Sequence, residues 1–190
     1  MAKKEDLKQL NKKKKQKVNY SWIITVTIMA FVISILFSFI SEIILSDANI
    51  IISSVLVLVF ILIGILFDII GVSVTSSDEK PFHSMSTRKV RGADIAVSFI
   101  KSAEQVSSFC CDVVGDVCGI MSGTAGVVLA ASLSSKFNID LIIMSLIITG
   151  VIAALTIGGK AVGKGFAINK GNFILYEFAK IISFFYKPKK

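Results

Sequence analysis

Charged residues are scarce in this chain of 190 residues: Asp, Glu, Lys and Arg together make up 18% of it, whereas hydrophobic residues make up 54%. This composition, with a mean hydropathy of +0.77, excludes an ordinary soluble domain and favours a multi-pass membrane protein. The only histidine is His83, so the chain has no paired histidine ligands. No Ser-His-Asp set and no credible nucleotide-binding loop is present either, and we therefore expect no enzymatic activity.

Cysteine is also rare, and its placement excludes a disulfide framework. The three cysteines, Cys110, Cys111 and Cys118, lie in one short stretch. An odd number of cysteines this close together is a poor basis for disulfide bonds, and no second cluster of metal ligands exists to complete a thiolate site. We expect them to be reduced and to pack as small apolar residues.

Four apolar stretches approach the length of about 20 residues needed to cross the hydrocarbon core of a bilayer. They cover residues 22–45, 50–74, 109–133 and 139–158. The first is too long for a typical signal-peptide core and is not followed by a small-residue cleavage pattern, so we expect it to stay in the protein. The sequence thus predicts an all-α integral membrane protein with four transmembrane helices.

Basic residues flank these stretches and predict their orientation. The net charge is +8, and lysines and arginines gather in residues 1–19, 75–108 and 160–190, whereas the two short turns between stretches carry little charge. The positive-inside rule then places both termini in the cytoplasm, as a multi-pass protein of the cell (plasma) membrane. Basic clusters beside membrane segments meet anionic lipid headgroups, so we expect the bilayer and no nucleic acid as partner.

The basic regions contain two further predicted helices and two breaks. Residues 92–108 have apolar side chains at helical spacing, and residues 172–186 are apolar with a narrow polar stripe. We expect both as cytoplasmic juxtamembrane helices lying at the interface, although a shallow re-entrant segment stays open for the second. We expect residues 75–84 to form a polar connection. We expect the glycine-rich residues 157–165 to kink or unwind the fourth helix.

Two aspartates at the start of the third stretch are the best candidates for a functional site. Asp112 and Asp116 are four residues apart, so on an α-helix their carboxylates share a face and can reach one hydrated cation. Mg²⁺ prefers oxygen ligands, and the hydroxyl groups of Ser73 and Ser122 are expected to add neutral ones. The alternative is structural: Asp112 is solvated at the interface, and Asp116 bonds to Ser, Lys or backbone donors.

Two other features predict contacts between helices. Asp68 lies near the end of the second stretch, where an ion pair with Lys160 or Arg88 is expected. The small-residue run 119–131 predicts a close packing face, used within the bundle or in a homodimer.

Several local strings occur in the order seen in one transport family. They are Phe67-Asp-Ile-Ile-Gly-Val-Ser-Val-Thr-Ser-Ser, Arg88-Lys-Val-Arg-Gly-Ala-Asp-Ile-Ala, Val114-Gly-Asp-Val and Gly158-Gly-Lys-Ala-Val-Gly-Lys. From about residue 50 to 186 the chain resembles the transmembrane domain of the CorB/CorC (cyclin M, CNNM) magnesium-transport family. The resemblance implies three membrane helices, a cytoplasmic helical belt and a closing juxtamembrane helix.

The resemblance divides the chain and implies a function. Residues 1–20 are a basic cytoplasmic tail, residues 21–49 an additional transmembrane helix with its turn, and residues 50–190 the CorB/CNNM-like domain, without CBS or CorC-type domains. The implied function is transport of a divalent cation, magnesium or cobalt, or support of that transport, and no cofactor is expected apart from bound Mg²⁺. The family's acidic positions are replaced here, with Gly71 and Gly159 in their places. The alternative is therefore a non-transporting scaffold or regulatory protein derived from that domain.

Overall fold

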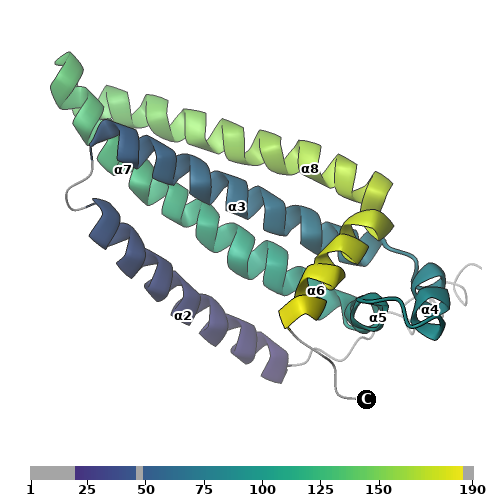
Figure 1. The fold of residues 1–190 in the computed structure, drawn as a ribbon. Helices are drawn as coiled ribbons and strands as arrows, with labels where there is room; N and C mark the ends of the chain where they lie inside the picture. The colour runs from purple at the N-terminus through teal and green to yellow at the C-terminus, as the bar shows by residue number, and fades with distance from the viewer. Residues whose placement is uncertain (1–19, 46–48, 186–190) are drawn as a thin grey trace, which may run out of the picture.

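The computed structural model describes residues 20–45 and 49–185, and nearly all of them are helical (Figure 1). The elements are α2 (Tyr20–Leu45), α3 (Ile50–Ser76), α4 (Glu79–Thr87), α5 (Ala93–Lys101), α6 (Ala103–Ser108), the π-helical segment η1 (Phe109–Gly115), α7 (Asp116–Phe137) and α8 (Leu141–Phe185). No strand occurs in the described ranges. The predicted tail 1–20 lies outside them except for Tyr20, as do residues 46–48 and 186–190.

Four helical stretches are long and apolar enough to cross a bilayer, as the sequence predicted. They are Tyr20–Leu45, Ile50–Ser76, Ala103–Phe137 and Leu141–Phe184, the third being formed by α6, η1 and α7 together. Large apolar side chains on the outer faces of α2 and α8 are exposed, among them Phe31, Phe39 and Leu146. Apolar surface of this extent is costly in water and inexpensive in lipid.

Helix α3 is the central element of the bundle, and α7 and α8 both pack against it (Figure 1). Glycines allow α3 and α7 to approach closely: a Cβ atom on Gly64 would lie 3.3 Å from the Cys118 Cβ atom and 3.3 Å from the Gly115 carbonyl oxygen. Helix α2 lies on the other side of α7, and the rings of Phe37 and Phe60 meet edge to face with centroids 6.1 Å apart.

The predicted break in residues 157–165 is wrong, because α8 remains helical through all of them. A Cβ atom on Gly159 would lie 2.3 Å from Ile65 Cδ1, and one on Gly163 would lie 2.7 Å from Ile69 Cγ1. These glycines therefore make room for α3 side chains and do not end the helix. The kink occurs later, at Lys170, whose φ of −124° and ψ of 26° are not helical.

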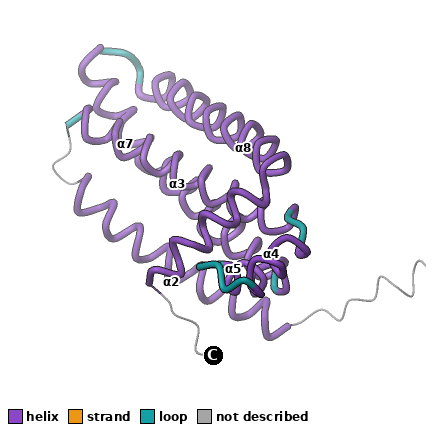
Figure 2. Tube along the Cα trace, turned by 45° about the vertical axis from the view of Figure 1, so that its right-hand side comes forward, coloured by secondary structure: helices purple, strands orange, loops and turns teal. Residues whose placement is uncertain are grey.

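Beyond Lys170 the chain turns back across the end of the bundle, as both views show (Figure 2). This returning segment of α8, residues 171–185, corresponds to the second predicted juxtamembrane helix. It packs on α5 and on the end of α3 through one apolar cluster. The buried members of that cluster are Val74, Phe82, Ile95, Ala96, Val97, Leu175 and Ala179.

The segment between α3 and η1 contains more helix boundaries than predicted. The predicted polar connection 75–84 includes most of α4, which forms because Phe82 is buried in the apolar cluster. The predicted helix 92–108 is divided at Ser102, where φ is −112° and ψ is 33°. The second part, α6, continues through η1 into α7 and so belongs to the third long stretch.

Candidate functional site

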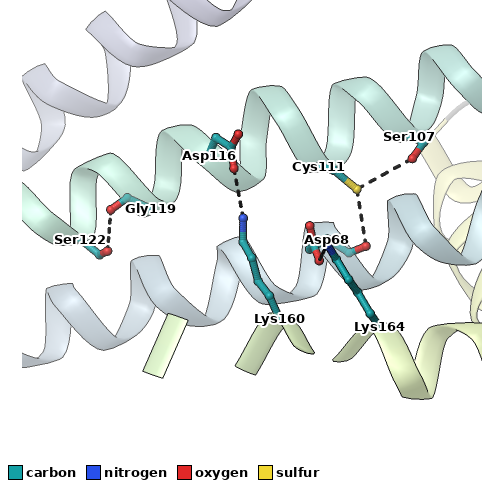
Figure 3. Close-up of polar contacts among 8 residues, drawn as sticks. All are labelled: Asp68, Ser107, Cys111, Asp116, Gly119, Ser122, Lys160 and Lys164. Carbon is teal, nitrogen blue, oxygen red and sulfur yellow. Dashed lines mark hydrogen bonds and ion pairs between the residues drawn. The ribbon is translucent and has the colours of Figure 1, made fainter. Parts of the chain in front are cut away.

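Two lysines on one face of α8 meet two aspartates from two other helices (Figure 3). Lys160 donates a hydrogen bond of 3.1 Å from Nζ to Asp116 Oδ1 at the start of α7. One turn further along α8, Lys164 Nζ lies 3.7 Å from Asp68 Oδ2 on α3. We use the name Asp–Lys crevice for these two adjacent ion contacts between the helices. It connects the three central helices of the bundle.

Asp68 is the buried acid of the crevice, since only 4% of its side chain is exposed. Among the described residues, its Oδ2 atom has no hydrogen-bond partner. The distance of 3.7 Å to Lys164 is well beyond the roughly 2.7–2.9 Å of a charge-assisted hydrogen bond. A buried carboxylate held this loosely is an expensive arrangement, because burial removes water that the ammonium group replaces only in part.

Lys160 and Asp116 have the opposite distribution of burial. The lysine side chain is 19% exposed, and the aspartate side chain is 65% exposed. A Cβ atom on Gly115 would lie 3.6 Å from Lys160 Nζ, so this glycine leaves space for the ammonium group beside the helix. The two ion contacts thus combine a partly buried cation, Lys160, on one level with a buried anion, Asp68, on the next.

The residues predicted as one metal site are distributed along the bundle. Asp112 is exposed on η1, and Asp116 is bonded to Lys160, the kind of contact that the structural interpretation expected. Ser73 and Ser122 are fully buried, and their hydroxyl groups donate to the carbonyl oxygens of Ile69 and Gly119, at 2.7 Å and 2.8 Å. Ser122 is six residues beyond Asp116 on α7, about 9 Å along the helix axis. Their oxygens therefore do not surround one point.

The spacing of the two aspartates is also altered by the local backbone. The shared-face argument assumed an α-helix from Asp112 to Asp116, but residues Phe109–Gly115 form the π-helical segment η1. Hydrogen bonds in such a segment join residues i and i+5, and π turns are frequent at functional sites. No cluster of three or more His, Cys, Asp or Glu side chains able to hold a metal is found in the described part of the chain.

The three cysteines are free thiols: Cys110 and Cys111 lie in η1, and Cys118 lies on α7. Cys110 and Cys118 are buried, and Cys111 Sγ lies 3.7 Å from the backbone carbonyl oxygen of Asp68 and 3.8 Å from Ser107 Oγ. A Cβ atom on Gly71 would lie 2.4 Å from Cys111 Sγ, so that position admits only glycine without rearrangement. The small side chains bring η1 close to α3 at the level of Asp68.

The expected partner of Asp68 was wrong, and the role of Lys164 was not foreseen. Gly163 packs on Ile69, and this register of α8 against α3 places Lys164 beside Asp68, while Lys160 is bonded to Asp116. A signal was present in the sequence: Lys160 and Lys164 repeat the spacing of Gly159 and Gly163. A helix face that approaches α3 through glycines carries its lysines at the edge of the same contact.

Comparison of the chain with protein-family models, curated proteins and solved structures finds no match.

Proposed function

We propose that this protein crosses the cell membrane four times, with both termini in the cytoplasm, and binds and transports a divalent cation at the Asp–Lys crevice. The four long apolar helices and their exposed apolar side chains support the membrane setting. The lysines and arginines of residues 75–108 and 160–190 support the orientation, because basic residues gather on the cytoplasmic side of membrane helices. In this orientation the crevice lies in the cytoplasmic half of the bundle.

The observation that carries the proposal is the buried and under-satisfied carboxylate of Asp68. Its Oδ2 atom has no hydrogen-bond partner in the described residues, and the nearest ammonium group is 3.7 Å away. An ionisable side chain within a membrane-spanning helix is costly, by about 2.5–3.5 kcal/mol at the bilayer centre on insertion scales, and such residues commonly mark ion pathways. A carboxylate held this loosely is suited to exchange the ammonium group of Lys164 for a bound cation.

Charge balance requires that a divalent cation displaces lysine ammonium groups when it binds at the crevice. Lys160 and Lys164 together carry the charge of one divalent ion and neutralise Asp68 and Asp116 when no ion is bound. A Mg²⁺ ion that keeps several of its waters requires only one or two carboxylates. The Lys164 side chain is 52% exposed, so its ammonium group can move into water when a cation approaches Asp68.

The other predicted ligands have secondary parts in this proposal. The carboxylate of Asp112, exposed on η1, attracts cations to the crevice from the cytoplasmic side. Ser73 and Ser122 are fully buried and donate hydrogen bonds to carbonyl oxygens of their own helices, so in this proposal they pack the bundle and do not bind the ion.

A second function, a non-transporting membrane scaffold, is favoured by the tighter of the two ion pairs. The 3.1 Å bond from the mostly buried Lys160 to Asp116 fastens α8 to α7 without any ion. If Lys164 holds Asp68 equally firmly in the membrane, the lysines are permanent substitutes for a cation. Transport is then absent, and the bundle serves only to present its surface to a partner.

Cation-dependent stability of the purified protein distinguishes the two functions. Thermal unfolding is followed in nanodiscs over 0 to about 20 mM MgCl₂, with ionic strength held constant by choline chloride. Transport predicts a rise in Tm with Mg²⁺ because the ion binds only the folded state. The rise should disappear in Asp68→Asn and remain in Glu104→Gln, a neutralisation of an exposed acid outside the crevice. A wild-type Tm that does not respond to Mg²⁺ would support the scaffold.

A further inference from the structure

A second charged site lies on the returning segment of α8, away from the Asp–Lys crevice. It is a surface cavity of about 330 Å³ lined by Arg91, Glu177, Lys180, Ile181 and Phe184. Arg91 comes from the turn before α5, and the other four residues come from the returning segment. We call it the Arg91–Lys180 site.

Close backbone packing brings the turn that contains Arg91 against the returning segment at Lys180. Gly92 has a φ of +87°, and a Cβ atom there would lie 3.0 Å from both the Lys180 nitrogen and the Lys180 Cα atom. Only glycine tolerates both conditions, since it has no Cβ atom and adopts positive φ at little cost. The preceding residue, Arg91, lines the same cavity as Lys180. Its guanidinium lies over the Phe184 ring, 5.7 Å from the centroid.

The lengths of the long helices place this site at the depth of lipid headgroups. Helix α3 has 27 residues and is therefore about 40 Å long, and α8 covers a similar distance before its kink at Lys170. A bilayer is about 30 Å thick in its hydrocarbon core and about 40–45 Å with its headgroups. A segment that crosses the bundle at the end of these helices lies among the headgroups of the cytoplasmic leaflet.

The charges of the site match a single phosphodiester. Arg91 and Lys180 contribute two positive charges, and Glu177, whose Oε2 atom lies 3.5 Å from Lys180 Nζ, contributes one negative charge. About half of each side chain in that pair is exposed, so the pair is weak and Lys180 can turn to another anion. The net charge of the site is therefore +1, and the single negative charge of one phosphodiester neutralises it.

The apolar members of the site favour a lipid over a soluble anion. Phe184 is 74% exposed although it is one of the largest apolar side chains, and Ile181 beside it is also exposed. Interfacial helices commonly carry exposed aromatic and aliphatic side chains next to cationic ones. The apolar side chains contact lipid acyl chains, and the cations contact anionic headgroups. We propose that the Arg91–Lys180 site binds the phosphodiester of an anionic phospholipid, with the acyl chains against Ile181 and Phe184. This inference rests on the proposed membrane orientation and is independent of cation transport.

Lipid binding is tested by native mass spectrometry of the full chain after exchange from detergent into mixed micelles of phosphatidylglycerol and phosphatidylcholine. The wild type should retain phosphatidylglycerol in preference to phosphatidylcholine. The double variant Arg91→Gln/Lys180→Gln should lose this preference by about tenfold, and Glu177→Gln should increase it. Lys136→Gln, which removes an exposed lysine at the opposite end of the bundle, should leave it unchanged.

Two outcomes overturn the inference. Unchanged phosphatidylglycerol preference in the double variant means that the lipid binds elsewhere. Competition by soluble glycerophosphoglycerol at concentrations similar to those of the lipid means that the site takes a free phosphodiester and not a lipid. All variants are also measured in the D68N background, where the proposed cation binding should be lost, so that failure of the lipid site is distinguished from failure of the proposed transport. Equal helix content by circular dichroism shows that the variants are folded.

Discussion

Lys164 Nζ lies 3.7 Å from Asp68 Oδ2, and the two side chains differ sharply in burial: 52% of the lysine is exposed but only 4% of the aspartate. Loss of hydration on burial therefore penalises the charge of the aspartate much more than that of the lysine. Removing the lysine leaves a buried carboxylate without a counter-charge, whereas removing the charge of the aspartate leaves an ammonium group that water can solvate.

The first prediction concerns the asymmetry of this pair. Lys164→Gln should lower the free energy of unfolding by about 1–3 kcal/mol, and Asp68→Asn should change it little or raise it. Chemical unfolding in micelles without divalent cations measures both. The double variant should recover most of the stability lost in Lys164→Gln. Equal losses in the two single variants would show that the pair is tighter than its distance indicates.

The second prediction concerns the neighbouring pair, where burial is reversed. Lys160 is the mostly buried member, so Asp116→Ala should cost about 1–3 kcal/mol by leaving its ammonium group unpaired. Lys160→Met keeps the apolar length of the side chain and leaves an exposed, solvated carboxylate, so its cost should be smaller. The same unfolding experiment ranks the two variants. A larger cost for Lys160→Met would contradict the assigned burial.

The third prediction uses glycines of α8 that have different surroundings. Gly163→Val should weaken the contact of α8 with α3, because its first added atom alone would lie 2.7 Å from Ile69 Cγ1. Gly158→Ala is the control, since nothing lies within 4 Å of its Cβ position and alanine is the better helix former by about 1 kcal/mol. Thermal unfolding should give a lower Tm for the first variant and an equal or higher Tm for the second. A neutral Gly163→Val would mean that α8 does not pack closely on α3 at this level.

Much of this fold could be predicted from hydropathy, because four long runs of Ile, Leu, Val and Phe leave few alternatives to helices of membrane length. The position of the kink, at Lys170, could not be predicted in this way. Glycine within a helix is compatible with a break and with close packing, and only the position of Ile65 and Ile69 opposite Gly159 and Gly163 decides between them. The α4 helix was missed because its stability depends on burying Phe82, a long-range contact.

The candidate site was predicted less well than the fold. The sequence indicated that acidic residues near the ends of apolar segments are important, and Asp116 does lie in the crevice. Their partners depend on the register between helices that are far apart in the chain. Lys164 pairs with Asp68 because of glycine-mediated packing, and η1 changes the relation of Asp112 to Asp116. Neither effect is visible in the local spacing of charges.

The fourth prediction concerns the orientation of the bundle. Cysteine introduced by Lys136→Cys, at the end of α7 away from the crevice, should react with a membrane-impermeant maleimide in intact cells. Cysteine introduced by Lys80→Cys, on α4, should react only after the cells are permeabilised. Both variants carry Cys111→Ser, because Cys111 is the least buried of the native thiols. The reverse pattern would place the crevice in the outer half of the membrane and contradict the proposed orientation.

Magnesium uptake by proteoliposomes tests the central proposal most directly. Wild-type protein and Glu104→Gln, reconstituted with a magnesium-sensitive dye inside the vesicles, should show uptake that protein-free vesicles lack. Asp68→Asn, reconstituted in equal amount, should reduce that uptake to the level of protein-free vesicles. Uptake by Asp68→Asn equal to that of the wild type, or no uptake by the wild type itself, would contradict the assignment of the Asp–Lys crevice as a cation path.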